Sequence, residues 1–187
     1  MGMRRVRVGP VRSAWVAVIL LGSFPLSLPA QESGTAPRAR RQRDAVHLVS
    51  GMRPNDPKLS ETLDGAVTSL QEGHEVVILF DGKSVTSLRM HMNRGKKTPL
   101  EEVEIAGQER QALAERLGVP PAQTPRNYLE YIQHLARAGA QVFANRNAVQ
   151  LYGLAEEEIH PMARSISSRQ MGEILDASDL CYTYAVR

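Results

Sequence analysis

The residues best placed to do chemistry are polar side chains that follow short apolar runs. They are Gly51 and Arg53 after the run 46–49, Asp81 and Lys83 after 75–80, and Asn145, Arg146 and Asn147 after 140–144. If these runs are parallel strands, their carboxyl ends share one edge of the sheet, where open α/β sheets bind ligands. Several hydrogen-bond donors and one carboxylate predict a site for a small anion or polar metabolite. The alternative is that Asp81 only forms a turn and Asn145 only caps a helix.

Thiol chemistry depends on one residue, because Cys181 is the single cysteine. One cysteine cannot form an internal disulfide, a CxxC redox pair or a multi-thiolate zinc site. It falls in the apolar run 180–184, which predicts a strand and therefore a buried, unreactive thiol.

Other catalytic and metal-binding patterns are weak. Met90-His91-Met92 groups soft ligands that copper can use, but a surface loop explains the triplet equally well. The remaining histidines have no ligand spacing, and Glu156-Glu157-Glu158 reads as a solvated helix start. No GxSxG, GxGxxG or Walker sequence occurs. We therefore expect no metal, no cofactor and no hydrolase triad.

The elements that position these residues alternate between strands and helices. Strands are predicted at 46–49, 75–80, 140–144, 163–166 and 180–184. Helices are predicted to start at Asp56-Pro57, near Glu101, at Thr124-Pro125, at Asn147 and after Ser167, whereas residues 83–92 are ambiguous. The pattern predicts a three-layer α/β/α sandwich around a mainly parallel sheet of about five strands.

The N-terminal segment has the three parts of a secretory signal peptide. Four arginines precede the apolar run 14–28, and Ala30 provides a small residue for cleavage, with Ala36 as a second candidate. The alternative is an uncleaved anchor, although the run is shorter than a membrane span. We expect residues 1–30 to be removed, leaving an exported protein, periplasmic or secreted, with no stable membrane span.

Charge separates the rest of the chain into two parts. Residues 31–43 are polar and rich in arginine, which predicts a flexible linker. From Asp44 to the end, the sequence has 15 basic and 19 acidic residues, so the predicted domain 44–187 is mildly acidic. The overall charge of +3 therefore comes from the leader and the linker, and it does not support nucleic-acid binding.

Four segments in order resemble blocks of the DsrE/DsrF-like family. They are HLVSG, SLQEGHEVVILFDGKSV, HLARAGAQVFANRNAVQLYGL and SSRQMGEILDASDLCYTY, with about 91–124 as an insertion. The resemblance implies the sandwich fold and assembly as trimers or hexamers. It also implies sulfur metabolism, because many members carry persulfide on a cysteine after the third strand.

The sequence departs from that family at the reactive position. Alignment of the third block places Asn145 where the family cysteine stands, and asparagine has no thiolate that could accept sulfur. The leading hypothesis is therefore an exported, non-catalytic module that binds a small ligand or acts as an oligomeric accessory protein. Two alternatives stay open: a sulfur carrier that uses Cys181, and a structural oligomer packed through apolar helix faces and the Tyr182–Tyr184 edge.

Overall fold

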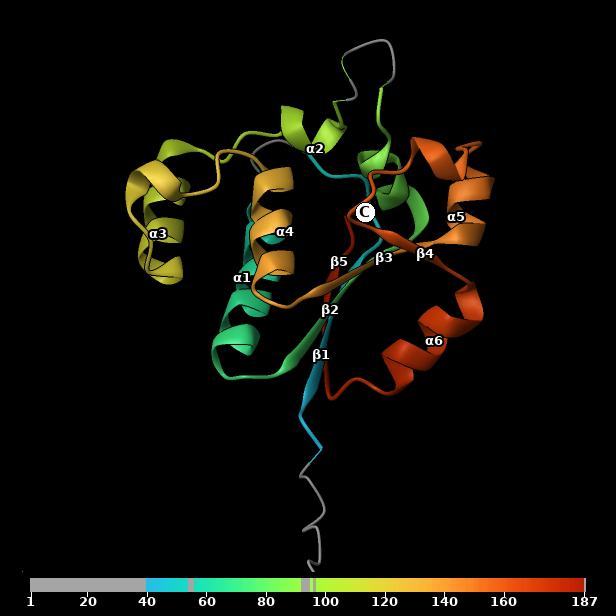
Figure 1. Ribbon diagram of the computed structural model, residues 1–187, viewed down its shortest axis with the longest axis horizontal. Helices are drawn as coiled ribbons and strands as arrows, with labels where there is room; N and C mark the ends of the chain where they lie inside the picture. Colours follow the sequence, from blue (N-terminus) through green and yellow to red (C-terminus); the bar gives the residue numbers. More distant parts are fainter. Residues whose placement is uncertain (1–39, 54–55, 92–94, 96, 187) are drawn as a thin grey trace, which may run out of the picture. The chain divides into compact units, whose positions relative to one another are not determined.

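The computed structural model describes residues 40–53, 56–91, 95 and 97–186, and its centre is a five-stranded sheet (Figure 1). The strands are β1 (Arg43–Leu48), β2 (Glu75–Phe80), β3 (Gln141–Asn145), β4 (Arg164–Ile166) and β5 (Leu180–Tyr184). Every pairing is parallel, and the order is β4-β3-β2-β1-β5. The prediction of a parallel α/β/α sandwich is confirmed.

Alternation along the strands divides the apolar side chains between two cores. Val46, Ile78 and Val142 belong to the larger core, which also contains side chains of α1 (Pro57–Gln71) and α4 (Tyr128–Arg137). Ala45, Leu79 and Phe143 belong to a smaller core closed by Met171 of α6 (Ser168–Asp176). Both faces of the central strands are therefore buried, which explains why β2 has five consecutive apolar residues.

The helices change sides because the chain reverses its direction across the sheet. From β1 to β4 the chain moves steadily toward one edge, with α1 and α4 in the first two crossovers. From β4 it returns through α6 to β5 at the opposite edge, and right-handed crossovers in opposite directions lie on opposite faces. Figure 1 shows α1 and α4 on one side of the sheet and α6 on the other.

Two 3₁₀ helices and a short α-helix cover the ends of the strands. The 3₁₀ helix η1 (Gly82–Leu88) follows β2, and it contacts α5 (Arg146–Leu151), which follows β3. The 3₁₀ helix η4 (Glu156–Glu158) precedes β4. Residues 83–92, which the sequence left ambiguous, thus begin as 3₁₀ helix.

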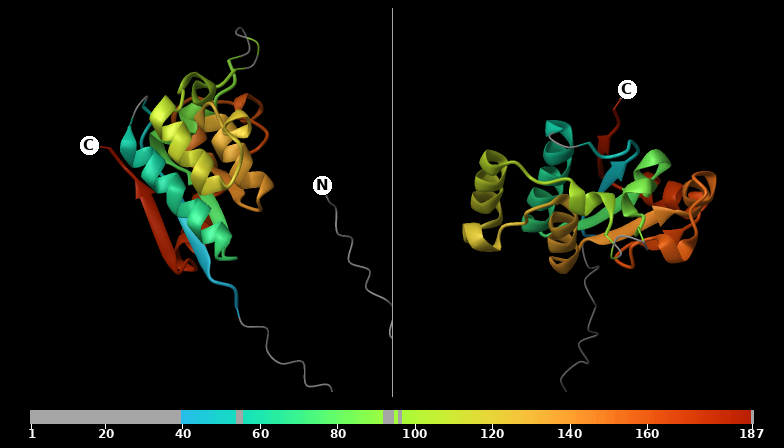
Figure 2. Two further views of the ribbon diagram at one scale, coloured as in Figure 1. Left: turned by 90° about the vertical axis from the view of Figure 1, so that its left-hand side faces the viewer. Right: turned by 90° about the horizontal axis from the view of Figure 1, so that it is seen from above.

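Part of the predicted insertion forms an outer layer against α1 (Figure 2). It contains α2 (Pro99–Glu102), α3 (Gly107–Leu117) and the 3₁₀ helix η3 (Pro121–Gln123). Glu109 of α3 accepts hydrogen bonds from Ser60 and Tyr128. Arg116 of α3 pairs with Asp64 of α1. These contacts fix α3 to the polar side of the α1 and α4 layer.

Two expected helix boundaries in this region are wrong. The helix expected to start near Glu101 is split into two, because Val103 and Ile105 turn inward and Ile105 donates its N–H to the Arg126 carbonyl. Helix α4 starts at Tyr128, capped by Asn127, and not at Thr124-Pro125. The Asn127 side chain accepts the Glu130 N–H, whereas the Thr124 hydroxyl bonds back to Pro120.

The predicted leader (1–30) and residues 31–39 of the predicted linker lie outside the described residues. The end of that linker is ordered structure, since Arg43 is the first residue of β1 and its side chain pairs with Glu75. Among the described residues, no helix has the length and apolar character needed to cross a membrane.

Candidate functional site

Four polar side chains form a continuous hydrogen-bonded row at the carboxyl ends of the strands, on the α6 side of the sheet. His47 Nε2 lies 3.3 Å from Asp81 Oδ2, and Asn145 Nδ2 donates to Asp81 Oδ1 at 2.8 Å. Ser168 Oγ donates to Asn145 Oδ1 at 3.0 Å. We call His47, Asp81, Asn145 and Ser168 the polar row. It brings together two residues predicted from sequence and two that were not.

Strand alternation places these side chains on one face. His47 follows Val46 of the larger core and pairs in register with Leu79 of the smaller one. Asp81 comes directly after β2, and Asn145 ends β3 two residues beyond Phe143. Only the pairing of the strands makes these residues neighbours.

The polar row spans the point where the fold reverses. After β3, helix α5 joins the core of α1 and α4, whereas after β4 the chain enters α6 on the opposite side. Adjacent parallel strands whose connections diverge in this way form the position at which such sheets bind ligands. The bond from Ser168 to Asn145 crosses this position.

Asn145 is fully occupied by structural contacts. Its Oδ1 caps α5 by accepting the Asn147 N–H at 3.0 Å and also accepts the Ser168 hydroxyl. Its Nδ2 donates to Asp81, and only 7% of the residue is exposed. The helix-cap alternative is therefore correct for this side chain, which also links β2, β3, α5 and α6.

His47 has a ring nitrogen that takes no part in the row. Its side chain is 19% exposed, and within the described part of the chain only Nε2 has a polar partner. Nδ1 is left to accept or donate a hydrogen bond, according to the tautomer. A ligand beside the row would meet this nitrogen and the carboxylate of Asp81.

The other predicted residues do not join the row through their side chains. The stem of Lys83 passes next to Gly51, and Arg53 lies near the hydroxyl of Tyr184. Arg146 forms an ion pair with Glu156 at 3.0 Å, and Asn147 reaches the row through its backbone N–H alone. The predicted cations are thus dispersed around the strand ends.

The expectation that Cys181 is buried is wrong, because its side chain is exposed. It does lie in a strand, but β5 is at the edge of the sheet and α6 covers the smaller core without covering this position. Cys181 pairs with Ala45 and Thr183 pairs with His47, so both project on the side of the polar row. Cys181 Sγ is 3.7 Å from Thr183 Oγ1.

The tyrosines of β5 contact α1 and its cap. Tyr184 is buried and donates its hydroxyl to Asp56 at 2.8 Å, and the Tyr182 ring lies against Gly65 of α1. Burial and the hydrogen bond to Asp56 raise the pKa of Tyr184. Both side chains make contacts within the chain, and the contact between subunits expected at this edge stays a prediction.

The sequence could have suggested His47 as a site residue. A histidine between two buried apolar residues must point to the opposite face of its strand. Ser168 carried no comparable signal, because only the return crossover brings the start of α6 to the end of β3.

Of the Met90-His91-Met92 triplet, Met92 lies outside the described residues. The described residues contain no group of three or more His, Cys, Asp or Glu that could hold a metal.

Comparisons with known proteins identify a similar structure but no family. No family model matches the sequence, and no curated protein matches it. A crystal structure of the YchN protein from E. coli aligns with a TM-score of 0.46 and 11% sequence identity. The alignment covers 78% of this chain and all of that one, at 100%. A likeness of this degree supports no statement about activity or individual residues.

Proposed function

We propose that this protein is an exported, non-catalytic DsrE/DsrF-like module that binds a small polar metabolite at the polar row. The observation that carries the proposal is the bonding of both polar side-chain atoms of Asn145, which stands at the family's cysteine position and holds the strand ends in place. An asparagine amide is not a nucleophile, but in this arrangement it orders its neighbours for binding.

The charges at the row favour a neutral hydrogen-bonding ligand over an anion. Asp81 accepts from Asn145 and from the Gly82 N–H, so its charge is solvated by the protein. Because Arg146 is paired with Glu156, it does not offset that charge. A hydroxyl- or amide-bearing metabolite can bond with His47 Nδ1 without repulsion, whereas an anion would face a carboxylate.

Thermal-shift screening of the chain from Gln31 onward against neutral polyols, amides and small organic anions tests this proposal. We expect a neutral compound to stabilise the protein, and His47→Gln to abolish that stabilisation. The control is His134→Gln, because His134 lies on α4, outside the polar row. Equal shifts in the wild type and His47→Gln would contradict a site at the row, and a response only to anions would contradict its neutral ligand.

Export is the second part of the proposal and has its own test. The full chain expressed in a Gram-negative bacterium should appear in the periplasm or the medium, and its N-terminal sequence should begin at Gln31. Recovery from the cytosol with residues 1–30 intact would overturn it.

One observation favours a second candidate function, that of a sulfur carrier. Cys181 is exposed and projects on the same side of the sheet as His47. In such a transfer, the Cys181 thiolate would attack the outer sulfur of a donor persulfide, forming a new S–S bond and releasing the donor thiol. A mass gain of one sulfur atom in the wild type, absent from Cys181→Ser, would support this candidate. No mass gain would exclude it.

A further inference from the structure

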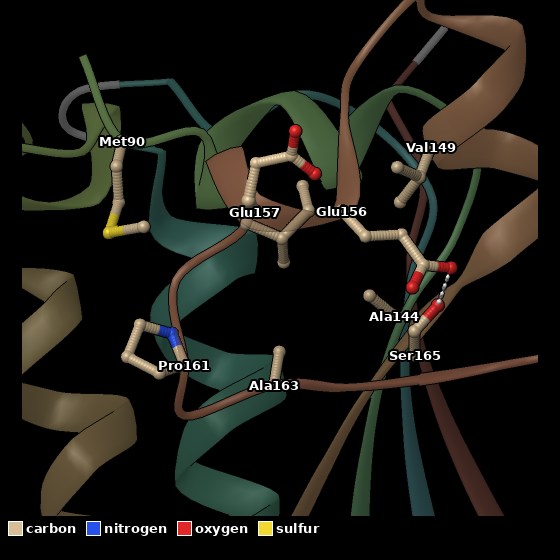
Figure 3. A pocket seen from close by; sticks show the side chains of 9 residues that line it. Met90, Ala144, Val149, Glu156, Glu157, Pro161, Ala163 and Ser165 are labelled. Carbon is tan, nitrogen blue, oxygen red and sulfur yellow. Dashed lines mark hydrogen bonds between the residues drawn. The ribbon is translucent and has the colours of Figure 1, made fainter. Parts of the chain in front are cut away.

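A cavity of about 550 Å³ lies on the opposite side of the sheet from the polar row, over β3 and β4 (Figure 3). Its walls combine apolar side chains with three polar ones: Met90, Ala144, Val149, Ile159, Pro161, Ala163, Ser165, Glu156 and Glu157. The volume is within the range of small-molecule sites, which is about 300–1,000 Å³.

The apolar part of the cavity comes from three separate elements. Ala144 and Ala163 form the part next to the sheet, and Val149 of α5 closes one side. Ile159, which is 8% exposed, anchors the segment between η4 and β4 and forms an isolated bridge with Arg89. The small side chains of both alanines leave the space open over β3 and β4.

The charged part of the cavity has one carboxylate in excess. Glu156 pairs with Arg146 and accepts the Ser165 hydroxyl at 3.3 Å, as Figure 3 shows for the latter contact. Glu158, which is next to the cavity, pairs with Arg89 at 2.8 Å. Among the described residues Glu157 has no polar partner and is exposed, so the rim of the cavity carries one uncompensated negative charge.

We propose that this cavity binds a small organic cation, an alkyl- or arylammonium group attached to an apolar body. The body lies against Ala163 and Ile159, and the ammonium group meets Glu157. Volume excludes a folded partner, and charge complementarity selects a cation over a neutral or anionic molecule of the same shape. This site is independent of the polar row.

The test uses phenethylammonium as the probe, with 2-phenylethanol and 3-phenylpropanoate as neutral and anionic comparators. Binding is followed by amide shifts in ¹H–¹⁵N NMR spectra of the chain from Gln31 onward. We expect shifts at Ala163 and Ser165 and the affinity order ammonium, then alcohol, then carboxylate. Glu157→Gln should weaken the ammonium by about three- to fivefold, the value of one exposed ion pair, and leave the alcohol unchanged.

Two further variants define the location. Ala163→Leu fills the cavity and should abolish binding of the ammonium probe, with unchanged amide shifts on α1 showing that the fold is intact. Glu115→Gln, an exposed carboxylate on α3, is the matched charge control and should bind as the wild type does. His47→Gln should also bind normally, which separates this site from the polar row.

Several results would overturn the proposal. These are the absence of binding by the ammonium probe, equal affinity for the carboxylate, unchanged affinity in Ala163→Leu, or equal losses in Glu157→Gln and Glu115→Gln. Shifts confined to β5 would place the probe outside the cavity and would also refute the proposal.

Discussion

Asn145 is the residue at which structural and functional interpretations meet. It occupies the position that the family resemblance assigns to a reactive cysteine, and the fold uses it to join Asp81, Ser168 and the first turn of α5. Replacing Asn145 should therefore lower the stability of the fold, whatever its effect on ligand binding.

Asn145→Asp tests this structural role. The aspartate keeps the acceptor for the Asn147 N–H, but it loses the donor to Asp81 and puts two carboxylates in contact. We expect a loss of about 2 kcal/mol in the free energy of unfolding at neutral pH. The repulsion raises the pKa of one carboxylate in the folded state, so the loss should shrink as the pH falls and that group binds a proton.

Denaturant unfolding at neutral and acidic pH measures this difference. Asn147→Asp is the control, because Asn147 is exposed in the first turn of α5, where an added acid is neutral or favourable. Equal losses in both variants, or a loss in Asn145→Asp that does not depend on pH, would contradict the assigned contacts.

A second residue predicts acid sensitivity. Asp44 is 1% exposed, and burial alone would raise its pKa. Hydrogen bonds from Ser69 and from His74, at 2.8 Å, outweigh burial and lower the pKa of Asp44. A lowered pKa stabilises the fold above the unfolded-state pKa of about 3.9, and this contribution is lost as the pH falls through the folded-state value.

Asp44→Asn should accordingly destabilise the protein at neutral pH by about 1–3 kcal/mol, because His74 loses its carboxylate partner. The difference in stability between Asp44→Asn and the wild type should disappear in acid, because the wild-type Asp44 becomes protonated. Thermal unfolding across the pH range measures this difference, and a constant difference down to low pH would be inconsistent with this contribution.

At the scale of elements, the packing of α1 on β5 requires a close approach between the two. A Cβ at Gly65 would lie 2.7 Å from the Tyr182 ring, whereas a Cβ at Gly172 of α6 would meet nothing within 4 Å. Gly65→Ala should therefore cost about 1–3 kcal/mol by overpacking. Gly172→Ala should gain about 0.5–1 kcal/mol through helix propensity.

This pair of variants distinguishes packing from propensity, since both glycines are in helices. Urea unfolding measures both, and Gly65→Ala should also perturb the near-ultraviolet spectrum of Tyr182. A more stable Gly65→Ala variant would contradict this expectation, since α1 could then move away from β5 without a loss in the free energy of unfolding.

For the whole molecule, the open edge and exposed side of β5 suggest self-association. Cys181 and Thr183 are exposed on this edge strand, and no described residue pairs with its outer side. Unpaired edges invite pairing with another chain, and a lysine there opposes it. We expect light scattering to give a mass above that of a monomer, and Thr183→Lys to shift it toward the monomer.

Gln111→Lys on α3 is the matched control, because Gln111 is also exposed and α3 lies outside the layer of helices that covers the sheet. A strictly monomeric wild type would rule out the oligomer that the family resemblance implies. An equal response of the two lysine variants would place the interface elsewhere.

Local signals predicted most of the fold correctly. The apolar run at β2, the Asp56-Pro57 helix start and the Ser167 capping box all depend on residues within a few positions of each other. The errors at α2, α3 and α4 occur where distant pairing, such as that of Ile105 with Arg126, overrides local helix preference. The site followed the same division, since Asp81 and Asn145 were found as strand ends but Ser168 was not.

The sequence by itself determined the class of fold, the acidic charge of residues 44–187 and the absence of a thiol at position 145. These properties depend on composition and short-range periodicity, which are present in the chain before it folds. Only the tertiary structure decided that both polar side-chain atoms of Asn145 are bonded, that Cys181 is exposed and that His47 meets Asp81. The reason is that strand order and register bring together residues more than 30 positions apart.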